Sequence, residues 1–87
     1  MARYKMLERP SCSEITRSFA TGNLVSFELE DVGSIRIVPD RYICEGAGYL
    51  HGIVSCDNPN VAIGDDFETY FADGYARITS ASISGLY

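Results

Sequence analysis

The stretch N-L-V-S-F-E-L-E-D-V-G-S-I-R-I-V-P, residues 23–39, decides the fold of this chain. Apolar side chains alternate with polar ones over residues 23–30, a period of two that is typical of a half-buried strand with an acidic outer face. The apolar positions are Val25, Phe27 and Leu29. Residues 31–33 predict a short turn into a β-branched strand over residues 34–38, which Pro39 should end. We therefore expect an antiparallel hairpin.

A helix is expected over residues 11–20. Ser11 and Glu14 have the spacing of a capping box, in which each side chain accepts a hydrogen bond from the other residue's backbone N–H. Gly22 supplies a stop that tolerates a positive φ angle. The spacing of three and four places several side chains on one face of this helix: Cys12, Ile15, Thr16 and Phe19.

Three further segments alternate enough to predict strands, over residues 3–7, 41–45 and 49–56. The last two are joined through the glycine-rich residues 46–48, and the Asp-Asn-Pro-Asn cluster at 57–60 predicts a turn.

Residues 65–74 fit two structures. As a helix, Asp65 would be the N-cap, Glu68 would lie three residues later, and Gly74 would end the helix. As a strand, the segment would lead through an Asp73-Gly74 turn into the next strand. Acidic residues at the start and glycine at the end favour the helix over residues 65–73.

Residues 75–83 predict a final strand. Its alternation with serines at 80, 82 and 84 indicates a weakly packed edge strand that is able to pair with another chain. The sequence thus predicts an α+β fold in one domain over residues 1–87, with a mainly antiparallel sheet of four to six strands. One helix over 11–20, and a second short one over 65–73, complete this expectation.

The charge of the chain is unevenly distributed. Residues 1–22 carry four basic and two acidic side chains, a balance of +2, whereas residues 23–87 carry three arginines and ten carboxylates, a balance of −7, giving the net charge of −5. The acidic part should attract cationic surfaces and repel nucleic acid, so direct nucleic-acid binding is not expected. No apolar run approaches the roughly 18 residues of a membrane span, and the start lacks the layout of a secretion signal. These features predict a cytoplasmic protein that does not contact membranes.

The three cysteines Cys12, Cys44 and Cys56 have no paired spacing and no histidines at metal-ligand distances. Free, buried thiols are the expectation, and a Cys44–Cys56 bridge would need neighbouring strands and an oxidising compartment. We expect no metal and no cofactor.

Chemistry based on side chains has few candidates. His51 is the only residue that ordinarily titrates near neutral pH, and its strand-like surroundings favour a structural hydrogen bond over a catalytic role. A nucleophilic pair of His51 with Cys44 or Cys56 stays open, because such pairs form in space rather than in sequence. Gly46 and Gly48 lack the Lys-Ser/Thr pair of a phosphate-binding loop and are interpreted as turn residues.

The surface composition indicates binding. The chain has six tyrosines, six arginines and one lysine, a bias that is found at protein interfaces. Acidic side chains gather in two groups that together could match the charge spacing of a nucleic-acid backbone. The predicted partner-binding residues are Glu28, Glu30, Asp31, Asp65, Asp66, Glu68, Asp73, Tyr70 and Tyr75.

These features lead to the hypothesis of a non-enzymatic inhibitor or modulator that docks on a cationic, nucleic-acid-handling surface of a larger protein or ribonucleoprotein. In size, acidity and lack of motifs the chain resembles the small inhibitors that phages encode against bacterial defence systems, including anti-CRISPR proteins; this resemblance of composition implies no residue roles. One alternative is a self-assembling subunit, including a homodimer, that uses the final strand. The other is a small enzyme or ligand-binding domain around His51.

Overall fold

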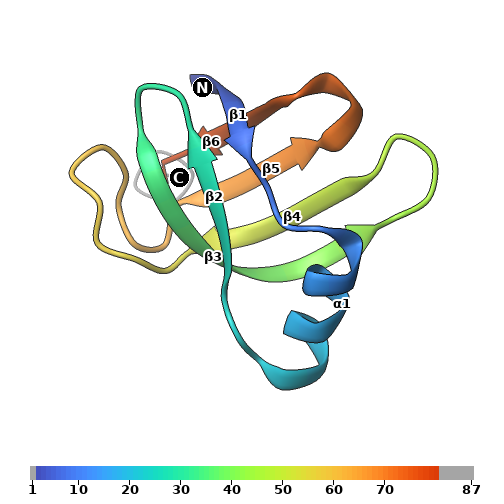
Figure 1. Cartoon of the computed structure of the whole chain (residues 1–87). Helices are drawn as coiled ribbons and strands as arrows, with labels where there is room; N and C mark the ends of the chain where they lie inside the picture. Colours follow the sequence, from blue (N-terminus) through green and yellow to red (C-terminus); the bar gives the residue numbers. More distant parts are fainter. Residues whose placement is uncertain (1, 81–87) are drawn as a thin grey trace, which may run out of the picture.

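Six strands and one α-helix form the fold, and the computed structural model describes residues 2–80 (Figure 1). In chain order the elements are β1 (Ala2–Glu8), α1 (Cys12–Thr21), β2 (Val25–Leu29), β3 (Gly33–Ile43), β4 (Tyr49–Val54), β5 (Asp66–Tyr70), the short 3₁₀ helix η1 (Phe71–Asp73) and β6 (Tyr75–Thr79). The expected α+β class, the antiparallel sheet and the N-terminal helix are confirmed.

The sheet closes into a six-stranded barrel, which the sequence analysis did not foresee. Each strand is antiparallel to the next, and β6 returns to pair with β1, for example Tyr4 with Ala76. The predicted edge strand is therefore wrong for Tyr75–Thr79, because β6 has β5 on one side and β1 on the other. The remainder of that prediction, residues 81–83 and the serines at 82 and 84, lies outside the described residues.

The hairpin expected at residues 23–38 is confirmed as β2 and β3. Their register runs from the Val25–Ile37 pair to the Leu29–Gly33 pair, and the apolar residues of β2 point into the barrel. In the turn, Asp31 adopts a φ of 68° and Gly33 a φ of 98°. Aspartate and glycine are among the residues that accept this left-handed region, so the turn sequence suits the tight reversal.

Pro39 does not end the strand, which corrects the prediction. β3 continues to Ile43, and the ladder between β3 and β4 has an irregularity between Pro39 and Arg41. The pairing of β2 with β3 has already stopped at Ile37. Pro39 thus lies where β3 is paired on one side only, which is where a strand tolerates a residue without an N–H.

Helix α1 has the predicted ends. The Ser11 N–H donates to Glu14 Oε1 at 3.0 Å, and the Glu14 N–H donates to Ser11 Oγ at 3.2 Å, which completes the capping box. At the other end, Gly22 has a φ of 75° and donates its N–H to the Ser18 carbonyl at 2.7 Å. An N-cap side chain such as that of Ser11 typically contributes about 1 kcal/mol.

The barrel interior is the hydrophobic core. The rings of Phe27 and Phe67 lie 4.6 Å apart, and both are fully buried. Helix α1 packs against β2 and β3 and adds Ile15 to this core (Figure 1). Its other buried residue is Ser18, whereas Phe19, which was expected on the buried face, is 40% exposed and stacks on a tyrosine of β3.

The helix predicted over residues 65–73 is wrong, because most of the segment forms β5. Phe67 and Thr69 point into the barrel and are buried, and they alternate with the half-buried polar residues Asp66 and Glu68. Asp65 does not cap a helix; its carboxylate accepts the Ala62 N–H at 3.0 Å in the preceding loop. Pairing with both β4 and β6 and burial of an aromatic ring outweigh the local helix signals.

The turn at the end of this segment also differs from the alternative prediction. A 3₁₀ turn over Phe71–Asp73 precedes Gly74, and Gly74 alone of the turn residues 71–74 has a positive φ, of 74°. A type I′ turn at Asp73-Gly74 would need positive φ at both residues. β5 and β6 are therefore joined by a four-residue loop between the paired Tyr70 and Tyr75.

Candidate binding surface

Three tyrosines form a row across the outside of the barrel. Tyr49 of β4 is directly opposite Tyr70 of β5, which is opposite Tyr75 of β6. The rings of Tyr49 and Tyr70 lie 4.9 Å apart, and Tyr70 and Tyr75 are 45% and 43% exposed. The Arg3 guanidinium of β1 lies 5.0 Å from the centre of the Tyr75 ring. We call the outward side chains of Tyr49, Tyr70 and Tyr75, with Glu68, Arg77 and Arg3 beside them, the tyrosine face.

Two hairpins hold this row in place. The N–H of Phe71 donates to the Gly48 carbonyl at 3.2 Å, and the N–H of Ala72 donates to the Ala47 carbonyl at 3.0 Å. These bonds join the β3–β4 hairpin to the loop between β5 and β6. The Arg9 guanidinium lies 4.4 Å from the centre of the Phe71 ring on the same loop. The backbone next to Tyr49 and Tyr70 is therefore held by hydrogen bonds between the two hairpins.

Glu68, the one carboxylate of the tyrosine face, is paired with two neighbours. The Tyr49 hydroxyl donates a hydrogen bond to Glu68 Oε2 at 2.7 Å. Arg77 forms an ion pair with the other carboxylate oxygen of Glu68. The Tyr49 hydrogen bond, followed by the charge of Arg77, lowers the pKa of Glu68. Burial and the bond to Glu68 raise the pKa of Tyr49 to about 12. Tyr49 thus stays a neutral donor and Glu68 stays a charged acceptor near neutral pH.

His51 is next to this face, between two carboxylates. Its Nδ1 lies 2.6 Å from Asp40 Oδ1, and its Nε2 lies 3.6 Å from Asp66 Oδ1. Within residues 2–80, no cysteine, serine or threonine is hydrogen-bonded to His51. The Cys-His pair that the sequence left open is therefore not formed in the described structure, and both ring nitrogens face carboxylates.

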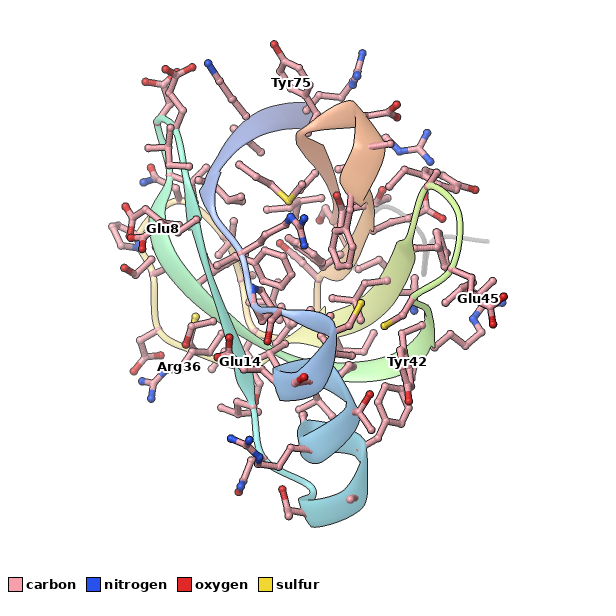
Figure 2. All side chains as sticks on the ribbon, turned by 45° about the vertical axis from the view of Figure 1, so that its right-hand side comes forward. Glu8, Glu14, Arg36, Tyr42, Glu45 and Tyr75 are labelled. Carbon is pink, nitrogen blue, oxygen red and sulfur yellow. The ribbon has the colours of Figure 1, made fainter. Side chains whose placement is uncertain are left out.

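A second charged region occupies the opposite side of β1. Glu8 of β1 is directly opposite Glu28 of β2, and Glu8, Glu28 and Glu14 of α1 line one groove between the helix and the strands. Glu30 and Asp31 are exposed in the turn that follows β2. We call these five residues the acidic wall. In Figure 2, Glu8 points outward on the left of the barrel, whereas Tyr75 is at its top.

The acidic wall differs from the tyrosine face in having no ion pair among the described residues. Glu28 accepts a hydrogen bond from Ser34 Oγ at 2.6 Å, and Glu14 is used in the helix cap. Arg17 lines the same groove without forming an ion pair there. Like charges directly opposite on neighbouring strands are destabilising, so the Glu8–Glu28 pair costs stability in the free protein.

The structure separates the predicted site residues into two sets. Five of them lie on β5, β6 or the loop between these strands: Asp66, Glu68, Tyr70, Asp73 and Tyr75. Glu28, Glu30 and Asp31 belong to the acidic wall, and strand β1, with the basic residues Arg3 and Lys5, lies between the two acidic groups. Asp65 is only 7% exposed, and its carboxylate is used inside the loop, so it is not available at the surface.

Sequence reasoning missed five residues of these surfaces, one of which, Glu14, was expected only as part of the helix cap. Tyr49, Arg3 and Arg77 join the tyrosine face because the strand register aligns them, and Glu8 joins the acidic wall although its segment is basic on average. The alternation of β1, β4 and β6 could have assigned their outward positions. The order of the strands around the barrel could not be read from that alternation, because the pattern does not identify the neighbours of a strand.

The described residues contain no group of three potential ligands that could hold a metal ion. They also include no helix that is long and apolar enough to cross a membrane. Comparisons with models of protein families, with curated proteins and with solved structures found no match. The tyrosine face and the acidic wall are therefore the features of the molecule that indicate a function.

Proposed function

We propose that the protein is a non-enzymatic binding protein that docks on an arginine- or lysine-bearing surface of a larger, nucleic-acid-handling protein and inhibits or modulates it. The observation that carries this proposal is the row of three tyrosines, two of them more than 40% exposed, on backbone that is fixed by two hairpins. Tyrosine and arginine dominate the anchoring positions of protein interfaces because they bury a large area with few rotatable bonds.

The exposed carboxylates of the acidic wall and Asp73 favour a cationic partner. Tyrosine rings attract guanidinium and ammonium groups, and the Arg3–Tyr75 contact is an example within this chain. Exposed Asp73, Glu30 and Asp31 form no ion pair with the described residues and are available to a partner's basic side chains. The net charge of −5 would draw such a partner in.

The tyrosine face and the acidic wall meet on β1. Lys5 is opposite Tyr75 on one side, and on the other its carbonyl accepts the Glu30 N–H at 2.9 Å. One partner surface that covers this corner could contact Tyr75 and Glu30 together. On this proposal the tyrosines anchor the complex and the carboxylates guide the approach.

The test is affinity capture from the native host with three proteins: wild type, the double variant Tyr70→Ser/Tyr75→Ser, and the control Ile63→Ser. Ile63 is 65% exposed in the loop between β4 and β5, so its replacement removes an exposed apolar side chain away from the tyrosine face. We expect wild type and the control to retain the same basic protein, and the double variant to lose it. Equal capture by all three would contradict the proposal.

A further inference from the structure

Two cysteines from separate elements are neighbours at the end of the helix. Cys12 is the first residue of α1, and Cys44 directly follows β3. Both line one shallow depression between the helix and the β3–β4 hairpin. Hydrogen bonding with the Cys12 thiol, assisted by burial and the Cys12 charge, raises the pKa of Cys44 to about 11. The two cysteines thus lie side by side along this depression.

The packing of the helix keeps these thiols together. The rings of Phe19 and Tyr42 lie 4.5 Å apart, and Thr16 Oγ1 is 3.4 Å from Tyr42 Oη. The capping box fixes the first turn of α1, in which Cys12 lies. Cys12 is half-buried and Cys44 is exposed, so a small reagent can reach the pair. All three cysteines are free, as expected, but only Cys56 is buried.

The bridge considered from the sequence, between Cys44 and Cys56, is excluded by the same geometry. Cys56 follows Val54, which pairs with Ile37, whereas Cys44 is beyond Ile43 at the other end of the β3–β4 ladder. Cys56 is buried, and its sulfur accepts the Arg36 N–H at 3.1 Å.

We propose that Cys12 and Cys44 are a redox site that forms a reversible intramolecular disulfide when the protein meets a small disulfide oxidant such as glutathione disulfide. The bond would fasten the N-terminus of α1 to the β3–β4 hairpin, in which Tyr49 pairs with Ile43, the residue that precedes Cys44.

The reaction is two successive thiol–disulfide exchanges. One thiolate of the pair attacks one sulfur of glutathione disulfide, forms a mixed disulfide and releases one glutathione thiolate. The thiolate of the other cysteine then attacks the protein sulfur of this mixed disulfide and releases the second glutathione. Two protons and two electrons leave the protein thiols, and two molecules of reduced glutathione carry them away.

Both cysteines line the same depression, so either sulfur is accessible to the oxidant. The thiolate is the nucleophile in each exchange, and the raised pKa of Cys44, about 11, slows the steps in which Cys44 attacks near neutral pH.

The test is oxidation of the whole protein in glutathione redox buffers, followed by thiol labelling under denaturing conditions and peptide mapping. We expect two of the three thiols to be lost, a Cys12–Cys44 peptide in the map, and a single labelled cysteine, Cys56. The thermal midpoint should rise by roughly 10 °C on oxidation. Cys12→Ser and Cys44→Ser should show no such rise and should carry glutathione on the remaining partner or no modification.

Cys56→Ser is the matched control and should oxidise as the wild type does. If this variant fails to fold, the wild-type peptide map alone decides the outcome. A map in which Cys12 and Cys44 stay reduced, carry separate glutathione adducts, or pair with Cys56 or a second chain would overturn the proposal.

Discussion

The two sides of β1 use charge in opposite ways. On the tyrosine face, Glu68 is paired with Arg77 and accepts the Tyr49 hydroxyl, so its charge stabilises the barrel itself. On the acidic wall, Glu8 and Glu28 oppose each other without an ion pair among the described residues, although Arg9 and Arg17 line the same groove, so the repulsion between the two carboxylates is unfavourable in the free protein. Local arrangements that lower stability are where function is expected. On the proposed function, the tyrosine face is the rigid anchor of the complex and the acidic wall guides the approach of the partner.

The largest loss of stability is expected from a substitution at Gly48, which lies beneath the tyrosine row. Gly48 has a φ of +76°, and a Cβ there would lie 2.8 Å from Cδ2 and 3.3 Å from Cβ of Phe71. Gly48→Ala should lower the free energy of unfolding by about 3 kcal/mol, since strain and overpacking add. Denaturant unfolding measures this loss. Gly46→Ala has a similar φ of +64° and no atom within 4 Å, so it should lose only about 1 kcal/mol.

If the two glycine variants were equally destabilised, the Phe71 contact would not hold the hairpins together. The tyrosine row would then rest on less rigid backbone than the account requires.

The hydrogen bond between Tyr49 and Glu68 provides a pH-dependent test. Tyr49→Phe keeps the ring and should cost about 1 kcal/mol at neutral pH, because the bond has a charged acceptor that is partly exposed to water. Glu68 has a lowered pKa in the folded state, so its contribution is present above the ordinary carboxyl pKa of about 4.3 and is lost as pH falls through the lowered value.

The sign is reversed for Tyr49 in alkali. Its folded pKa of about 12 exceeds the ordinary value of about 10, so its contribution is complete below pH 10 and is lost as pH rises toward 12. The difference in stability between wild type and Tyr49→Phe should therefore be largest at neutral pH and shrink on both sides. Thermal unfolding across the pH range measures it, and a difference that does not vary with pH would count against this bond.

The smallest change in stability is expected on the acidic wall, where the substitution should stabilise the protein. Glu8→Gln removes one member of the Glu8–Glu28 pair and should stabilise the protein by about 0.5 kcal/mol, less at high salt. Urea unfolding at low and high salt tests this gain. Glu45→Gln, on an exposed residue after β3, is the control and should change stability little. Destabilisation by Glu8→Gln would show that the repulsion is absent.

The sequence predicted those parts of the fold that local rules govern. The capping box of Ser11 and Glu14 located the helix, and the alternation of β2 located its buried face, because both signals act within a few residues. Closure of the barrel, the strand at β5 and the course of β3 past Pro39 depend on pairing between distant segments. A local pattern carries no information on that pairing.

The same division applies to the candidate surface. Tyr70 and Tyr75 were expected at an interface from composition, and their adjacency follows from the β5–β6 register. Asp65 was misassigned because an acidic residue before an apolar stretch resembles a helix cap, whereas its carboxylate closes a loop. Glu8 was overlooked because averaging the charge of residues 1–22 hid its position opposite Glu28.

The most direct test of the central claim is to measure association and dissociation rate constants with the captured partner for two variants. Tyr70→Ser/Tyr75→Ser should raise the dissociation rate by roughly 10- to 100-fold with little change in association, because anchors act after contact. Glu30→Gln/Asp31→Asn should lower the association rate and weaken its dependence on salt, with little change in dissociation. Wild-type rate constants for the tyrosine variant would contradict the account.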